Sequence, residues 1–195
     1  MSTRGSSRRW PSYSELRAEV ELLSAAFTGG HIQKARDPDP RSLALKLRVP
    51  GQTYYLTLSG DPQGARLEVG SEQPNTLPQP TGVGRWVRAH LIGQRIASIT
   101  LDPNDRIVTL MTPRGGLCLE LLPHASNLYT LTPDLRVMGW SKRIPSRELR
   151  LGKAWTPPER PDHLVLGEPS GVSSSSEPDQ ARDQTHDEIH DQASN

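Results

Sequence analysis

The chain has 195 residues, and its 23 Lys and Arg residues against 22 Asp and Glu residues give a formal net charge of +1. This length fits one domain, or one domain with a tail. No apolar run approaches the length of about 18 residues that a membrane span requires, and no apolar segment follows the basic N-terminus. The sequence therefore predicts a cytoplasmic protein. Its single cysteine, Cys118, excludes an internal disulfide and leaves no ligand set for zinc.

Charge divides the chain into a basic body and an acidic tail. Residues 168–195 hold seven acidic residues and one basic residue, which leaves residues 1–167 with 22 basic and 15 acidic residues, a net charge of +7. The tail also has few apolar residues, so it cannot bury enough surface to fold. We expect a disordered leader at residues 1–11, a folded domain at residues 12–160 and a disordered acidic Ser/Asp/Gln-rich tail at residues 161–195.

The first half of the domain predicts one helix and then strands. Apolar residues from Leu16 to Phe27 recur at spacings of four, three and four, which indicates a helix that Ser12 or Ser14 caps. Alternation over residues 43–49 and 54–58, on either side of Pro50-Gly51, predicts a hairpin. Residues 65–69 are a candidate third strand.

The second half predicts a helix followed by a run of strands. Residues 70–81 are rich in proline and predict a loop, and residues 81–91 a short helix. Alternating segments then follow at residues 95–100, 106–111, 117–121, 127–131 and 135–140. This order indicates an α+β fold, an antiparallel β-sandwich-like domain with two flanking helices.

The pair Asp105-Arg106 is a candidate binding site, because it stands on a turn directly before a predicted strand. A guanidinium at a strand end can contact a phosphate with two hydrogen bonds while the carboxylate orients it. The alternative is a turn aspartate that caps its own backbone beside an ordinary surface arginine.

The second predicted helix carries a candidate basic patch. Arg85 and Arg88 are three residues apart and share a face, Trp86 lies between them, and Arg95 follows the helix. Such a patch suits a phosphate backbone. The alternative is a solvated helix face with Trp86 packed inward. No phosphate-binding loop, dinucleotide fingerprint or nucleophile elbow is present, so we expect neither enzymatic activity nor a cofactor.

Seven segments together resemble the N-terminal (NFACT-N) domain of the NFACT proteins, whose bacterial members are called RqcH or fibronectin-binding protein A. They occur in the family's order between residues 14 and 160. The segments are residues 28–34, 45–48, 65–67, 85–96, 105–108, 120–128 and 152–158.

The resemblance implies a fold similar to the N-terminal domain of formamidopyrimidine-type DNA glycosylases. It implies binding to the large ribosomal subunit and to tRNA on stalled nascent-chain complexes, with Asp105-Arg106 engaging the tRNA. The RNA-binding residues expected on this basis, together with the basic patch, are Asp105, Arg106, Arg85, Arg88, Arg95, His124 and Asn127.

The sequence also departs from the family. The family's Gly-Arg-His is replaced by Pro123-His124-Ala125, which removes one arginine. The helix-hairpin-helix, coiled-coil and RNA-binding segments of full-length members do not follow. The resemblance therefore leaves open a gene fragment, a separately encoded partner that supplies these segments, or a repurposed paralogue. Met1 and Ser2 stand where a glycosylase needs its nucleophilic proline, which argues against base excision. A fibronectin- or matrix-binding adhesin, and a degenerate domain acting as a protein-interaction module, remain alternative functions.

Overall fold

The computed structural model describes residues 10–123, 125–145 and 147–158. Every described residue belongs to the unit Met1–Arg160. Residues 1–9 of the expected leader and the expected acidic tail at residues 161–195 lie outside the described residues. The elements in chain order are α1 (Tyr13–Phe27), β1 (His31–Asp39), β2 (Ser42–Val49), β3 (Gln52–Ser59), β4 (Arg66–Gly70), α2 (Gly82–His90), β5 (Ser98–Leu101), β6 (Ile107–Thr112), β7 (Gly115–Glu120), β8 (Asn127–Leu131) and β9 (Val137–Trp140).

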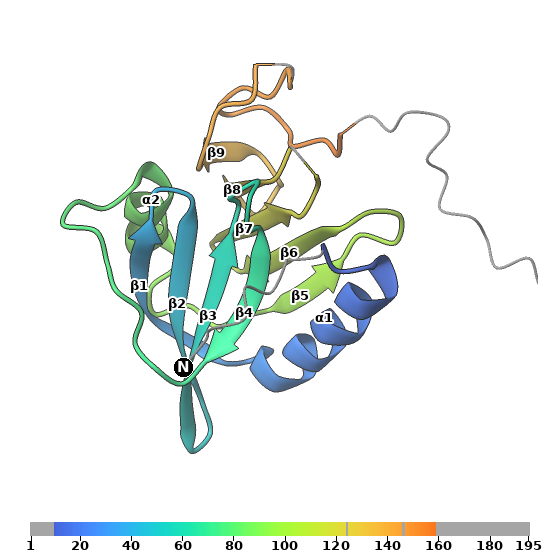
Figure 1. The fold of residues 1–195 in the computed structure, drawn as a ribbon. Coiled ribbons are helices and arrows are strands. Elements are labelled where there is room, and N and C mark those ends of the chain that lie inside the picture. Colours follow the sequence, from blue (N-terminus) through green and yellow to red (C-terminus); the bar gives the residue numbers. More distant parts are fainter. Residues whose placement is uncertain (1–9, 124, 146, 159–195) are drawn as a thin grey trace, which may run out of the picture. The chain divides into compact units, whose positions relative to one another are not determined.

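The strands form two antiparallel sheets that share one core. One sheet has the order β1-β2-β3-β4 and the other β5-β6-β7-β8-β9, so each is a simple meander of neighbours in sequence (Figure 1). Buried Leu, Ile and Val residues of both sheets and both helices belong to one cluster. The two sheets approach closely at Gly60, where a Cβ atom would lie 2.7 Å from the backbone nitrogen of Leu128. The α+β fold expected from the sequence is confirmed.

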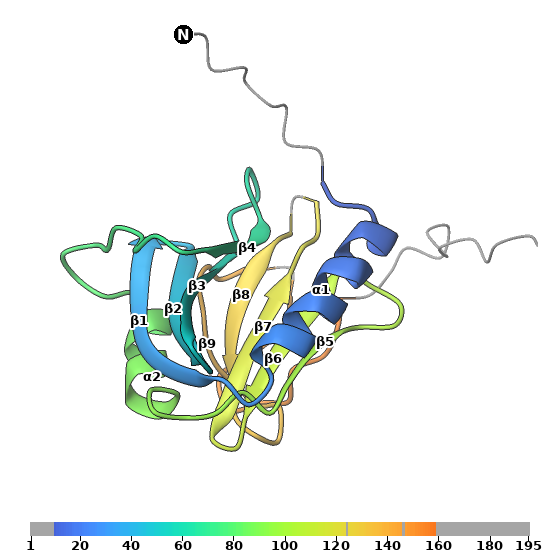
Figure 2. The same cartoon turned by 90° about the horizontal axis from the view of Figure 1, so that it is seen from below.

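Helix α1 forms because its start is capped and one face is apolar. The Ser12 hydroxyl accepts from the Glu15 backbone nitrogen, and the Glu15 carboxylate accepts from the Ser12 backbone nitrogen at 2.7 Å, which satisfies N–H groups at the helix start. The predicted stripe from Leu16 to Phe27 is the buried face. Figure 2 shows this helix lying across the sheet that begins with β5.

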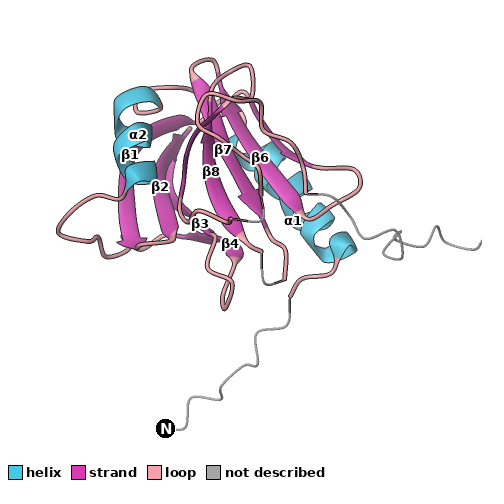
Figure 3. Cartoon of the chain, turned by 90° about the horizontal axis from the view of Figure 1, so that it is seen from above, coloured by secondary structure: helices cyan, strands magenta, loops and turns pink. Residues whose placement is uncertain are grey.

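Helix α2 lies on the other side of the domain, between the two sheets. It contacts β1 of the first sheet and β8 and β9 of the second. Figure 3 shows the helix beside β1. Thr81 caps it by accepting from the Gly84 backbone nitrogen at 2.9 Å. Val83 and Val87 are buried, so the remaining faces carry the arginines.

A segment after β9 continues the second sheet along its free edge. The backbone of Val137 donates to Lys153 at 2.9 Å and accepts from Gly152 at 2.7 Å, and Trp155 donates to Leu135 at 2.8 Å. We call residues 147–158 the closing segment. Its placement brings residues 152–158, the last of the seven segments that carry the family resemblance, beside β9.

Two sequence expectations need correction. Strand β1 was not predicted, because its register with β2 shifts twice and its buried residues, Ile32, Ala35 and Asp37, do not alternate. The strand expected at residues 95–100 begins only at Ser98. Residues 93–96 instead make backbone hydrogen bonds to residues 29–32, which ties the end of α2 to the end of α1.

Candidate nucleic-acid interface

The Asp105-Arg106 pair lies where the β5–β6 turn enters β6. The Asp105 carboxylate accepts from the Arg106 backbone nitrogen at 2.8 Å, and the Arg106 carbonyl accepts from the Leu121 backbone nitrogen at 2.8 Å. Both residues are half-buried. The contact expected of a turn aspartate that caps its own backbone is therefore present. It fixes the backbone from which both side chains project.

The Arg106 guanidinium has one described hydrogen bond, a long one of 3.4 Å from Nη1 to the carbonyl of Pro11. The turn is also held to the start of α1, because the Tyr13 hydroxyl donates to the Asp102 carbonyl at 3.0 Å. An arginine has five N–H donors, so most of this group's donor capacity is available to a phosphate or carboxylate.

At the same end of the sheet, β7 ends and β8 begins. Ile107 pairs with Glu120 on β7, and Glu120 pairs with Asn127 on β8. The loop between β7 and β8 therefore begins directly beside Arg106. The structure brings Asp105, Arg106 and Asn127 to the same end of the sheet. His124 lies in that loop but outside the described residues.

Asn127 is buried and used in the fold. Its amide nitrogen donates to the Lys142 carbonyl at 2.6 Å, and its amide oxygen accepts from Lys142 and Ser141 at 3.1 and 2.7 Å. With 1% of its surface exposed, this side chain cannot contact RNA directly without displacing its partners. It positions the segment after β9 instead.

Glu120 forms a buried polar cluster behind this edge. Its carboxylate accepts from Arg147 at 3.0 Å, from the Trp155 indole at 3.2 Å and from the Tyr129 hydroxyl at 3.3 Å. Burial raises the pKa of Glu120 to about 7, although the charge of Arg147 and the three hydrogen bonds act in the opposite direction. Burial likewise raises the pKa of Tyr129 well above its usual value. The cluster fastens the closing segment to the sheet.

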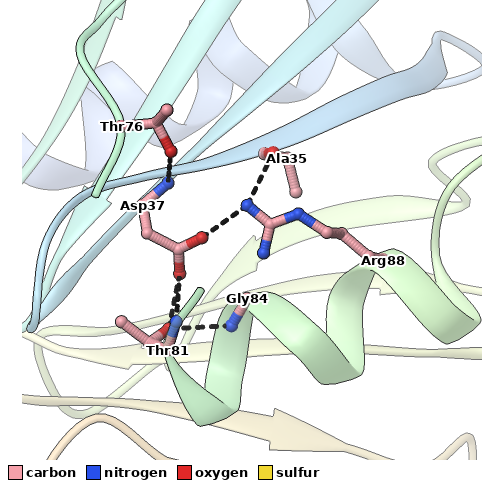
Figure 4. A network of polar contacts seen from close by, with 6 residues as sticks. All are labelled: Ala35, Asp37, Thr76, Thr81, Gly84 and Arg88. Carbon is pink, nitrogen blue, oxygen red and sulfur yellow. Dashed lines mark hydrogen bonds and ion pairs between the residues drawn. The ribbon is translucent and has the colours of Figure 1, made fainter. Parts of the chain in front are cut away.

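The arginines of α2 have different roles. Arg88 forms an ion pair of 2.5 Å with Asp37, which is fully buried, and donates to the Ala35 carbonyl at 3.1 Å (Figure 4). Asp37 also accepts from the hydroxyl and backbone nitrogen of Thr81. Arg88 therefore holds α2 to β1. Arg85 is exposed, as sequence reasoning expected of a basic patch.

Arg95 is also exposed, and it donates to the Gly29 carbonyl at 2.9 Å beyond the end of α1. It lies near the end of β6 that leads into the β6–β7 hairpin, because Ala97, two residues later, donates its backbone N–H to the carbonyl of Met111 at 2.8 Å. The same hairpin is close to α2, since a Cβ at Gly115 would lie 2.9 Å from Trp86. That hairpin is at the opposite end of β6 from Arg106. The structure thus separates the predicted residues into two groups, one at each end of a six-residue strand, about 20 Å at 3.3 Å per residue.

Sequence reasoning missed Asp37, Glu120 and Arg147. Asp37 sits in the unpredicted strand β1, where no alternation marked it. Glu120 lies inside the strand predicted at residues 117–121, and a carboxylate between Leu119 and Leu121 in an otherwise apolar segment was the signal for a paired acid. Arg147 had no local signal, because its partner is 27 residues away.

Two further observations concern the part of the chain that the structure describes. It contains no group of three or more His, Cys, Asp or Glu residues arranged to hold a metal ion. Neither of its helices combines the length and hydrophobicity needed to cross a bilayer.

Comparison with protein families gives a match over most of the chain. The family model described as NFACT N-terminal and middle domains matches residues 12–190. The chain is 33% identical over 118 residues to the Rqc2 homolog RqcH of Streptococcus pneumoniae, in strains D39 and R6. The match covers 56% of this chain but only 21% of those relatives, so the chain spans about a fifth of their length.

Solved structures share the fold. The N-terminal domain of fibronectin-binding protein PavA from Streptococcus pneumoniae has a TM-score of 0.69 at 24% identity, covering 74% of this chain and 60% of that one. The N-terminal part of the fibronectin/fibrinogen-binding protein of Streptococcus suis has a TM-score of 0.67 at 20% identity, covering 75% and 61%. The fibrinogen-binding protein of Staphylococcus aureus has a TM-score of 0.63 at 25% identity, covering 74% and 56%.

Proposed function

The chain belongs to the NFACT family, and on that premise we propose that it is a cytoplasmic RNA-binding module of the ribosome-associated quality-control type. Its partners would be the large ribosomal subunit and tRNA on stalled nascent-chain complexes. The similarity to RqcH is the observation that carries the proposal. The module acts by binding and orienting RNA, not by catalysing a reaction, and needs no cofactor.

The geometry of the Asp105-Arg106 turn supports this function. The backbone of Arg106 is fixed on both sides, by Asp105 and by Leu121, while its guanidinium keeps most of its donors for a ligand. A fixed backbone reduces the conformational entropy lost when the side chain binds a phosphate. The turn can therefore act as a preformed contact for the RNA backbone.

The exposed arginines of the α2 side form a second contact region in this proposal. Arg85 and Arg95 are exposed at the far end of β6 from the turn. Two cationic regions near opposite ends of a strand about 20 Å long would span several nucleotides, which fixes the orientation of an RNA better than one region does. The similarity in fold to the N-terminal domain of formamidopyrimidine-type DNA glycosylases, which the family resemblance implies, stays a prediction.

The experiment is co-sedimentation with ribosomal subunits, comparing the wild type with Asp105→Ala/Arg106→Ala. The matched control is Arg17→Ala/Glu21→Ala, which removes an exposed ion pair of α1, again one acid and one base. We expect the wild type and the control in large-subunit fractions with bound tRNA, and loss of tRNA from the first variant. Equal tRNA recovery from all three would refute the role of the turn.

A matrix-binding function is the second candidate, because two of the similar structures come from proteins described as fibronectin-binding. It predicts saturable binding to immobilised fibronectin that does not depend on Asp105 or Arg106. Sedimentation of the wild type only at the top of the gradient, together with such binding, would favour this function over the ribosomal one.

A further inference from the structure

A pocket between β1 and α2 is lined by cations and contains no carboxylate. It has a volume of about 340 Å³. Its lining residues are Gln33, Lys34, Ala35, Arg36, Thr76, Arg88 and Ile92. Three other pockets of the domain each include glutamates, such as Glu21, Glu68 and Glu148. A pocket with three cationic side chains and no acid on its wall favours an anionic ligand.

Two guanidinium groups of this pocket have donors without acceptors. Nε of Arg36 and Nη1 of Arg88 are buried, and neither has a hydrogen-bond partner among the described residues. A buried donor without a partner destabilises the fold, and more so when the group is charged. An oxyanion accepts several hydrogen bonds at once, so one bound in the pocket would satisfy whichever of these donors turns toward it.

Arg88 is held in place before any ligand binds. Its Nη2 atom is fixed by Asp37 and by the carbonyl of Ala35, as Figure 4 shows, so the orientation of the planar group is set by the fold. The Thr76 hydroxyl accepts from the Asp37 backbone nitrogen at 3.3 Å, which leaves its own hydrogen free to donate. The single charge of Asp37 offsets Arg88, and Arg36 and Lys34 supply the excess positive charge.

We infer that this pocket binds a phosphate group of an RNA backbone through Arg36, Arg88 and Lys34. The inference rests on the proposed function for its choice of RNA as the source of the phosphate. Gln33 and Lys34, at the rim of the pocket, are exposed. The pocket is therefore open to a phosphate that remains linked to a nucleoside on each side, as in an RNA strand. The site lies on the α2 side of the domain, away from Asp105-Arg106, and is a separate contact.

The first test is an NMR titration of the wild type with inorganic phosphate, with chloride at matched ionic strength as reference. The arginine Nε–H resonances report directly on the buried donor of Arg36. We expect a saturable shift of one such resonance that is absent in Arg36→Gln. This variant should fold normally, because the Arg36 side chain has no described hydrogen bond to lose and the substitution leaves the backbone pairing of β1 with β2 in place. No shift beyond that caused by chloride would overturn the site.

The second test measures binding of single-stranded RNA at several salt concentrations. Arg36→Gln and Lys34→Gln should each weaken binding about five- to tenfold and reduce the slope of log K against log salt by about 1. Arg17→Gln removes the same charge from α1, away from the pocket, and should have little effect. Equal losses from Arg36→Gln and Arg17→Gln would show only general charge attraction, which overturns the RNA contact.

The outcomes also separate this inference from the proposed function. RNA binding that depends on Arg36, by a protein that never sediments with ribosomes, would support the pocket and refute the ribosomal function. A phosphate-dependent shift without any dependence of RNA binding on Arg36 would overturn RNA as the source and identify free phosphate as the ligand.

Discussion

Removing the charge of Glu120 should change how stability depends on pH. The folded protein raises the pKa of this carboxyl from 4.5 to about 7, because burial outweighs the donors from Arg147, Trp155 and Tyr129. Between these two values the folded state binds more protons than the unfolded state. The free energy of unfolding therefore falls as pH rises through this window. At about 1.4 kcal/mol per pKa unit, the loss approaches about 3 kcal/mol.

Glu120→Gln tests this magnitude without changing the shape of the side chain. The glutamine oxygen can still accept from Arg147 and Trp155, and the Tyr129 hydroxyl can accept from the amide in place of donating. The contribution of Glu120 disappears, so the stability difference, variant minus wild type, should grow by about 3 kcal/mol from pH 4.5 to pH 8. Urea unfolding monitored by tryptophan fluorescence across this range measures it.

Other carboxyls add their own pH dependence, which is why the comparison between chains is the informative quantity. Glu148→Gln removes an exposed carboxyl from the same closing segment and controls for the loss of one charge. The difference from wild type should be flat for this control. If the wild-type and Glu120→Gln curves run parallel from pH 4.5 to pH 8, burial does not raise the pKa of Glu120 and the reasoning is wrong.

Two further predictions concern packing. Gly84→Ala should destabilise the protein by about 2–4 kcal/mol, because the new Cβ would lie 2.0 Å from the buried Asp37 carboxylate and disturb its pairing with Arg88. Gly82→Ala, in the same helix with open space around it, should be neutral or stabilising by up to about 1 kcal/mol, and equal effects of the two in thermal unfolding would contradict this account. Cys118 is fully buried and its pKa is raised, so thiol reagents should modify it only after unfolding; rapid reaction of the native protein would show that β7 is accessible.

The sequence predicts most of the elements, because their signals are local. The stripe of α1, its Ser12 cap and the alternation of β2, β3 and β6–β8 can each be recognised within about ten residues. Strand β1 could not be predicted, since its bulges and the buried Asp37 make sense only beside Arg88 and Thr81, more than 40 residues later. The resemblance correctly indicated the family, and Asp105-Arg106 was found at a strand end as expected.

The residues of the candidate site could likewise be predicted only in part from the sequence. Charge and spacing identified arginines, but they could not distinguish Arg88, which is tied to Asp37, from the exposed Arg85. Nor could they show that Asn127 is enclosed by Ser141 and Lys142. Such distinctions depend on burial and on partners distant in sequence, which only the folded arrangement provides.

The hydrogen bonds between the closing segment and β9 bear on how the domain should be produced. They occupy backbone groups of Val137 that would otherwise lie at the edge of the five-stranded sheet. An exposed strand edge is a template for pairing with another chain. A truncation that ends soon after Trp140 would uncover that edge and leave Glu120 buried without two of its donors. Such a fragment should self-associate, whereas one that extends through Pro158 keeps its edge covered.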